Sequence, residues 1–196
     1  MSHSYHRQLV FTIKDRCRVC YTCVRECPVK AIRIMNGQAE VMNDRCIGCG
    51  NCVKVCSQGA KIPLRSIEPV QELLQSGDRI AACIAPSFPA EFSEIDDHRK
   101  LVGMIRQLGF HQVVEVSFGA DLVAGEYESM INNGEYEGDI SSDCPAIVYF
   151  IRHYHPGLVP HLAPIASPMV AMTRVMKKRH GDDLKVVFIG PCFAKK

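Results

Sequence analysis

Residues 17 to 28 read CRVCYTCVRECP, and residues 46 to 57 read CIGCGNCVKVCS. Each stretch holds four cysteines with the spacing C-x2-C-x2-C-x3-C, and the second stretch repeats the first at an offset of 29 residues. This is the bacterial-type spacing for cysteines that ligate cubane iron–sulfur clusters, in which the fourth thiolate of each run binds the other cluster. The spacing therefore predicts two [4Fe-4S] clusters that exchange their fourth ligands.

The spacing assigns four cysteines to each cluster. The first set is Cys17, Cys20, Cys23 and Cys56, and the second set is Cys46, Cys49, Cys52 and Cys27. A pair of zinc sites is disfavoured because zinc ligands usually come as two separated pairs, and disulfides require an oxidising compartment. This part of the chain resembles the two-cluster bacterial ferredoxins, including Pro28 after Cys27, although Ser57 replaces the matching second proline.

Composition indicates an ordinary globular protein. Of the 196 residues, 47% are hydrophobic and 22% are charged, and the net charge of +2 gives no electrostatic case for nucleic acid or an anionic membrane. No apolar run is long enough to span a membrane, and the first residues lack the features of a signal peptide. We therefore expect no nucleic-acid partner, no membrane span and a cytoplasmic location under oxygen-poor conditions.

Three regions are expected along the chain. Residues 1–65 form an α+β ferredoxin-like module, residues 66–77 a linker, and residues 78–196 an α/β lobe. Within the module we expect a strand at residues 7–14 and a β-hairpin across residues 32–41, because Asn36-Gly37 is a typical hairpin turn. The linker contains a short amphipathic piece of one or two helical turns that ends at Gly77.

Strands and helices alternate in the lobe, which predicts a parallel sheet covered by helices. Expected strands lie at 79–87, 111–117 and 184–190, and expected helices at 94–109, 119–134, 145–155 and 167–181. The helix at 94–109 carries Ile95 on its apolar face, and Ser167 is the expected cap of the last helix. In such sheets the functional crevice lies beyond the carboxyl ends of the strands.

Three further cysteines lie in the lobe. Cys144 precedes the helix that starts at Pro145, and Cys192 follows the last strand. A helix N-terminus favours a thiolate, but lone cysteines are often small buried residues, and position alone leaves both readings open for this pair. Cys83 lies inside an apolar strand, and we expect it in the core.

The lobe resembles the iron-only ([FeFe]) hydrogenase large-subunit domain. Four segments carry the resemblance: IAPS at 84–87, FGADL at 118–122, SSDCP at 141–145 and GPCFAKK at 190–196. The resemblance implies that Cys144 and Cys192 are two of the four thiolates that hold the cubane of the active-site H-cluster. It further implies that Lys195 hydrogen-bonds a cyanide of the di-iron subsite.

The same resemblance implies that Ala85, Pro86 and Ser87 line the active-site pocket. Asp143 stands where the family has its proton-delivering cysteine, and it either relays protons or caps the following helix, which we favour. Tyr127 and Met130 stand where acids of the usual proton path are expected, which points to divergent, sensory members of the family.

The family's third signature, with its last two cysteines, does not occur in these 196 residues, and Gly190 replaces the usual methionine before Pro191. Eight of the eleven cysteines are assigned to the ferredoxin clusters, so only three remain. We therefore expect a truncated, incomplete lobe, so whether this chain alone is an enzyme stays open, because it cannot supply a complete active-site cluster.

Three functions are consistent with these features. The first is the N-terminal part of a divergent or sensory [FeFe] hydrogenase, which passes electrons through two [4Fe-4S] clusters to a hydrogen-reactive site. The second is a stand-alone ferredoxin-type carrier with an α/β docking scaffold, and the third is an iron–sulfur scaffold or assembly protein. The expected partners are a redox protein that donates or accepts electrons and a downstream signalling domain or protein.

Overall fold

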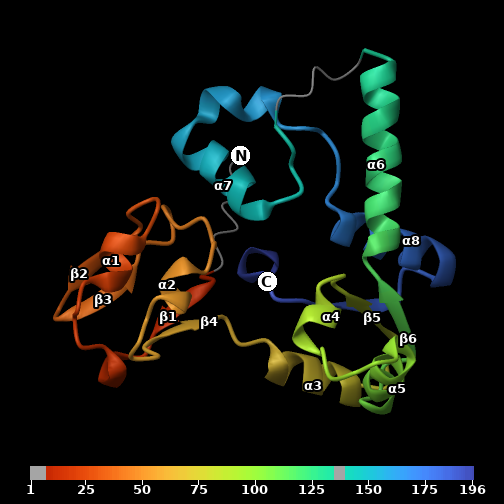
Figure 1. Ribbon diagram of the computed structural model, residues 1–196, viewed down its shortest axis with the longest axis horizontal. Helices are drawn as coiled ribbons and strands as arrows, with labels where there is room; N and C mark the ends of the chain where they lie inside the picture. Colours follow the sequence, from red (N-terminus) through yellow and green to blue (C-terminus); the bar gives the residue numbers. More distant parts are fainter. Residues whose placement is uncertain (1–7, 135–139) are drawn as a thin grey trace. The chain divides into compact units, whose positions relative to one another are not determined.

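The computed structural model describes residues 8–134 and 140–196. Two compact units make up the chain, and they do not follow each other in sequence (Figure 1). The first unit joins Met1–Arg65, described from residue 8, to Cys144–Leu162 and Cys192–Lys196. The second unit consists of Ser66–Asp143 and Ala163–Pro191. Two segments from the C-terminal half of the sequence therefore belong to the unit that contains the cysteine runs.

The first unit is built from short strands and helices. Its strands are β1 (Val10–Thr12), β2 (Ile32–Met35), β3 (Gln38–Val41) and β4 (Lys61–Pro63). Its α-helices are α1 (Thr22–Glu26), α2 (Asn51–Lys54) and α7 (Pro145–Tyr154), and its 3-10 helices are η1 (Lys14–Arg16), η2 (Pro156–His161) and η3 (Phe193–Lys195). β1 pairs with β4, and β2 pairs with β3, both antiparallel.

The predicted hairpin is confirmed. β2 and β3 are joined by Asn36 and Gly37, whose φ angles of 48° and 70° are both positive, as a two-residue turn of the I′ type requires. The strand expected at 7–14 is shorter, because only Val10–Thr12 pair with β4; Arg7 lies outside the described residues.

The core of the first unit combines aliphatic side chains with cysteines. Its fully buried residues are Val10, Cys23, Cys27, Val29, Ala31, Ile32, Ala39, Ile47 and Cys52. Three aromatic side chains of α7, namely Tyr149, Phe150 and Tyr154, pack against this cluster. The Tyr154 hydroxyl donates to the carbonyl oxygens of Arg45 at 2.8 Å and Val29 at 3.1 Å. Helix α7 is therefore fixed to the cysteine-containing part of the chain.

The second unit contains a three-stranded parallel sheet in the order β6-β5-β7, as predicted from the alternation of strands and helices. The strands are β5 (Ile80–Ile84), β6 (Gln112–Glu115) and β7 (Lys185–Ile189). The helices are α3 (Ile67–Gln75), α4 (Phe88–Glu91), α5 (His98–Gln107), α6 (Ser117–Asn132) and α8 (Pro168–His180).

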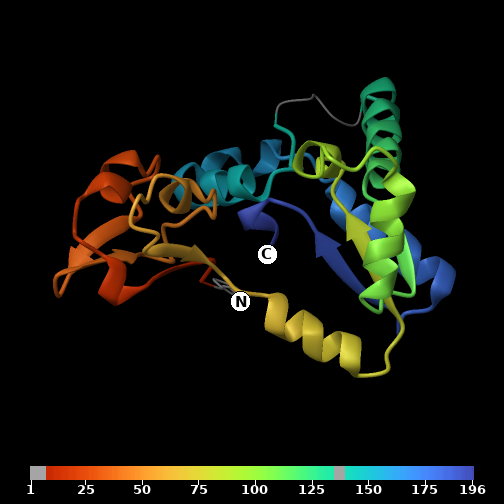
Figure 2. The same cartoon turned by 60° about the horizontal axis from the view of Figure 1, so that its bottom comes forward.

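Helices cover both faces of the central strand β5 (Figure 2). Ile80 and Ile84 point to the face covered by α3 and α5. Ala81 and Cys83 point to the opposite face, where they pack with Met172 and Met176 of α8. Because every residue of β5 is buried, its sequence is a continuous apolar run. The expectation that Cys83 lies in the core is confirmed, since its side chain is 0% exposed.

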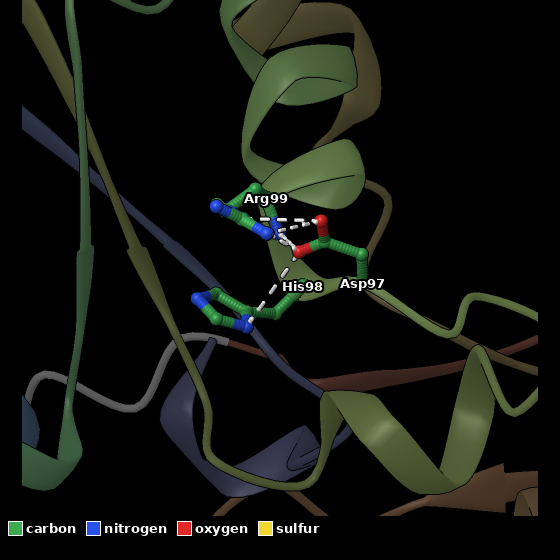
Figure 3. A network of polar contacts seen from close by, with 3 residues as sticks. All are labelled: Asp97, His98 and Arg99. Atoms are coloured by element: carbon green, nitrogen blue, oxygen red, sulfur yellow. Dashed lines mark hydrogen bonds and ion pairs between the residues drawn. The ribbon is translucent and has the colours of Figure 1, made fainter.

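Two helix starts differ from expectation. Helix α5 begins at His98, so Ile95 lies before it, because Asp97 caps the helix by accepting from the Arg99 amide at 2.9 Å. Figure 3 shows that the Arg99 guanidinium also contacts this carboxylate, and these hydrogen bonds lower the pKa of Asp97. Ser167 occupies the N-cap of α8, but its side chain forms no capping hydrogen bond.

Helix α3 is also longer than the expected one or two turns, with nine residues from Ile67 to Gln75, and Gly77 follows it with a φ of 79°. Across the described residues, none of the helices has the length and apolar character needed to cross a lipid bilayer.

Candidate metal centres

Four cysteines surround one cavity in the first unit. They are Cys17, Cys20, Cys23 and Cys56, three from the first run and the last cysteine of the second. The cavity has about 350 Å³ of free space, part of it open to solvent, and its remaining wall includes Ala39, Ala60 and Lys61. The set of thiols is the one that the spacing assigns to the first cluster.

The other four cysteines surround a second cavity of about 330 Å³. They are Cys27, Cys46, Cys49 and Cys52, so the fourth cysteine of the first run joins the first three of the second. Apolar side chains, among them Val10, Ile32 and Ile47, form much of the remaining wall. Within residues 8–134 and 140–196, no three His, Cys, Asp or Glu side chains converge on a point where they would hold a single metal ion. Four thiols spread around a cavity fit a multi-iron cluster, whose irons each take one thiolate.

The two cysteine loops share one backbone conformation. Residues at equivalent positions, 29 apart in sequence, have positive φ angles. The pairs are Val19 and Gly48 at 51° and 71°, Tyr21 and Gly50 at 61° and 78°, and Lys30 and Gly59 at 49° and 58°. Positive φ is costly for a β-branched residue such as Val19, and such strain persists where a functional site needs it. The loop shape therefore follows the cysteine spacing rather than the intervening residues.

Backbone amides donate to three of the cysteine sulfurs. The amide of Ala31 lies 3.2 Å from Sγ of Cys27, and the amide of Ala60 lies 3.3 Å from Sγ of Cys56. Both donors follow their cysteine by four residues, so the two contacts are equivalent in the repeat. Such N–H···S hydrogen bonds favour negative charge on sulfur and help to set the reduction potential of a bound cluster.

Burial and hydrogen bonding act in opposite directions on these thiols. Burial raises the pKa of Cys52 to about 12 and also raises the pKa of Cys46 and Cys23. A hydrogen bond with the Thr22 side chain lowers the pKa of the exposed Cys20. Because iron ligation requires thiolates, cluster binding releases protons from the buried thiols.

The second cysteine loop is covered by η3, whereas the equivalent part of the first loop is open. A Cβ at Gly50 would overlap the ring of Phe193, and a Cβ at Gly48 would lie 3.4 Å from Cα of Ala194. At the corresponding position of the first loop, the Tyr21 side chain is 50% exposed. Glycine is therefore required in the second loop by close packing as well as by positive φ.

Cys144 and Cys192 both lie in the first unit. Cys144 is the exposed N-cap residue of α7, and Cys192 is the half-buried N-cap residue of η3. Helix α7 contacts η3, which also carries the half-buried Lys195. The structure thus brings the two signature segments into the unit that holds the eight other predicted ligands.

The remaining predicted site residues lie in the second unit. Ala85 is buried at the carboxyl end of β5 and donates its amide to the Ile189 carbonyl at 2.8 Å, and Pro86 and Ser87 are exposed. Because these residues and the pair Cys144 and Cys192 belong to different units, their shared pocket stays a prediction.

Asp143 does not take the capping position that we favoured for it. The N-cap of α7 is Cys144, and Asp143 lies one residue earlier, where its Oδ2 accepts from Ser141 Oγ at 2.7 Å.

Sequence reasoning missed Lys61, which is buried in the wall of the first cavity. The signal for it was the internal repeat, because the position 29 residues earlier is the apolar Ile32. It also missed Phe193, whose ring lies over Gly50. Nothing in the local sequence pairs these two residues.

Comparison with known proteins agrees with this arrangement. Residues 9–57 match the 4Fe-4S dicluster domain, which indicates iron–sulfur clusters, and residues 78–196 match the family described as iron only hydrogenase large subunit, C-terminal domain. The chain is 29% identical over 136 residues to iron hydrogenase 1 of Clostridium pasteurianum, covering 60% of this chain and 24% of that protein.

A second relative is the NADP-reducing hydrogenase subunit HndD of Solidesulfovibrio fructosivorans, at 27% identity over 238 aligned positions. That alignment covers 100% of this chain and 40% of the relative, so the chain spans less than half the length of either curated relative. With its family match extending over residues 78–196, more than half of its length, the chain belongs to the iron-only hydrogenase large-subunit family.

Proposed function

We propose that this protein carries electrons through two [4Fe-4S] clusters towards a hydrogen-reactive site of the [FeFe] hydrogenase type. The first cluster is held by Cys17, Cys20, Cys23 and Cys56, and the second by Cys27, Cys46, Cys49 and Cys52. One observation carries the proposal, namely the division of eight thiols into two sets of four around two cavities, with the fourth cysteine of each run exchanged.

The direction of the electron path follows from the two loops. The first loop presents the exposed Cys20 and Tyr21, so the first cluster is the one that a redox partner protein reaches. The second loop is covered by η3, which follows Cys192. In this proposal Cys144 and Cys192 contribute two thiolates to the active-site cubane, and Lys195 lies beside its di-iron subsite. Ala85, Pro86 and Ser87 line the same pocket, and the protein works in a reducing cytoplasm.

Altered residues around the predicted proton path support a divergent or sensory member of the family. Asp143 replaces the expected cysteine, and its carboxylate accepts from Ser141. Tyr127 replaces an expected acid, and its hydroxyl donates to the same Ser141 at 3.3 Å. Hydroxyl groups therefore stand where carboxylate and thiol proton carriers are expected, which favours slow turnover and coupling to a signalling partner.

Serine substitutions test the exchanged ligand sets. The protein is reconstituted without oxygen, and its iron content is measured together with the electron paramagnetic resonance of the reduced clusters. About eight irons are expected for the two clusters, by the four-thiolate rule for cubanes. C17S and C56S are each expected to impair the same cluster, so the double variant C17S/C56S resembles either single variant.

The double variant C17S/C46S is the matched comparison, because it removes one ligand from each set. It is expected to lose the signals of both clusters. If C27S and C17S instead impaired one cluster together, the ligands would follow the runs without exchange, and the proposed sets would be wrong. Wild-type protein that binds no iron would overturn the proposed function itself.

A further inference from the structure

Lys61 is the one charged residue that is buried in the described part of the chain. It is 3% exposed, it begins β4, and it lines the cavity that Cys17, Cys20, Cys23 and Cys56 surround. A buried ammonium group is costly unless hydrogen bonds and an opposite charge compensate for the lost hydration.

Neutral oxygens satisfy only part of this requirement. Nζ of Lys61 donates to Oγ1 of Thr12 at 2.6 Å and to the carbonyl oxygen of Ala39 at 2.7 Å. Among the residues that the structure describes, the ion pairs involve Asp97 alone, so no carboxylate neutralises Lys61. The negative charge that balances this cation must therefore come from the cysteine sets beside it.

The fold itself does not require a cation at this position. Lys61 pairs with Thr12 across β1 and β4, and the equivalent pair 29 residues earlier is Ile32 with Val41, across β2 and β3. Ile32 is also buried, at 5% exposure. One half of the repeat thus has an apolar pair where the other half has a lysine and a threonine, which indicates an electrostatic role for Lys61.

The field of Lys61 reaches thiols of both sets. After burial, which raises the pKa of Cys23 and of Cys52, the charge of Lys61 is the strongest influence acting in the opposite direction. It also lowers the pKa of Cys46. Lys61 therefore favours negative charge in the first cavity and in the second.

We propose that Lys61 is a shared counter-charge of the two iron–sulfur clusters and holds both of their reduction potentials above the values that an apolar residue would give. Each cluster takes up one electron from a low-potential donor, and that electron adds one negative charge beside the ammonium group. Since opposite charges attract strongly in a buried site, the cation stabilises the reduced form of each cluster. This inference rests on the proposed function.

The test compares K61M with K61R in the reconstituted full chain. K61M keeps a long side chain and removes the charge; the Thr12 hydroxyl and the Ala39 carbonyl stay paired, because Thr12 Oγ1 also donates to that carbonyl at 2.6 Å. K54M is the matched control, since Lys54 is an exposed lysine of α2 in the same module. Iron content is measured first, and midpoint potentials then follow from an anaerobic redox titration.

K61M is expected to lower the reduced-to-oxidised ratio of both clusters at least tenfold at a fixed potential, which equals a 59 mV shift for a one-electron couple. K61R and K54M are expected to keep midpoints close to those of the wild type. Unchanged midpoints in an iron-loaded K61M would overturn the inference and leave the proposed function standing. Absence of iron from the wild type would overturn the proposed function instead.

K61I supplies a second neutral variant, with the residue that the repeat already accommodates at Ile32. It is expected to take up the same amount of iron as the wild type and to shift both midpoints in the same direction as K61M. If both neutral variants fail to bind iron while K61R binds it normally, Lys61 is required for cluster assembly and the proposed tuning role is wrong.

Discussion

Gly50 lies directly under the ring of Phe193, and this single contact joins the second cysteine loop to η3. Gly50 also has a φ of 78°. We expect G50A to destabilise the first unit for two reasons. A left-handed alanine costs about 1 kcal/mol, and the added Cβ overpacks against the ring, which costs about 1 to 3 kcal/mol more. The measurement is chemical denaturation of the iron-loaded protein, followed by cluster absorbance.

G37A is the matched control, because Gly37 has a similar φ of 70° but no atom within 4 Å of its would-be Cβ. It is expected to show the backbone cost alone. Substitution of Phe193 by alanine should bring the loss in G50A down to that of G37A. Equal losses in G50A and G37A with Phe193 intact would show that η3 does not pack on the loop.

Cys83 makes a prediction about alkaline stability. Burial raises its pKa to about 11 from the usual 9.0, so the folded state keeps the thiol protonated where the unfolded chain ionises it. The unfolded state then binds fewer protons, and stability falls as the pH rises from 9 to about 11, by about 3 kcal/mol in total. C83A lacks this term. The difference in unfolding free energy between wild type and C83A, followed by circular dichroism, should therefore decline across this range and stay constant below pH 8.

Individual residues also show how far sequence reasoning reaches. The grouping of the eight cysteines follows from their spacing, because three thiols two residues apart must share one loop; their ligation stays a prediction. Lys61 was out of reach of local patterns, since a lysine in a strand is normally an exposed residue. Its burial becomes visible only when it is aligned with Ile32 through the repeat.

Helix α7 is attached to the cysteine-containing part of the chain through its aromatic face. Tyr154 donates its hydroxyl proton to carbonyl oxygens of Val29 and Arg45, and we expect Y154F to destabilise the first unit by about 1 kcal/mol, the usual value of such a hydrogen bond. Y149F is the control, because Tyr149 packs against the same core but its hydroxyl has no hydrogen-bond partner among the described residues.

The unfolding midpoint in denaturant, again read from cluster absorbance, compares the two variants. Y149F should change the free energy of unfolding by less than about 0.5 kcal/mol, as is usual away from specific contacts. Equal effects of Y154F and Y149F would mean that the hydroxyl contacts of Tyr154 contribute nothing to the attachment of α7.

Elements with a strong local signal were predictable. The hairpin turn at Asn36-Gly37 needs two positive φ angles, and these residue types tolerate them. Helix α5 shows the opposite case, because apolar periodicity extends back to Ile95 while the carboxylate of Asp97 caps the helix later in the chain. Periodicity describes a buried face, and it does not say where the backbone amides first need an acceptor.

At the scale of the whole molecule, the two units are interleaved in the sequence. The segment Cys144–Leu162 is flanked on both sides by parts of the second unit, yet its aromatic residues pack against the cysteine-rich core. The sequence shows that YFIRHY is an apolar helix face, but no local pattern names the surface that it covers. Long-range partners of this kind follow from the three-dimensional packing alone, which is why the interleaving could not be predicted.

Interleaving leads to a prediction for iron removal. The core of the first unit contains Cys23, Cys27 and Cys52, and its cavities lie where clusters would fill them, so chelation is expected to unfold that unit. The core of the second unit consists of aliphatic and methionine side chains around β5, and it should stay folded. Hydrogen exchange with mass spectrometry distinguishes the two.

After chelation, amides of α7 should lose protection together with those of α1 and α2, although α6 and α8 on either side of α7 in the sequence keep theirs. The reason is that the aromatic face of α7 is buried against the metal-dependent core. Protection of α7 that persists with α6 and α8 would mean that this helix is stabilised by the second unit and that the interleaving of the two units is wrong.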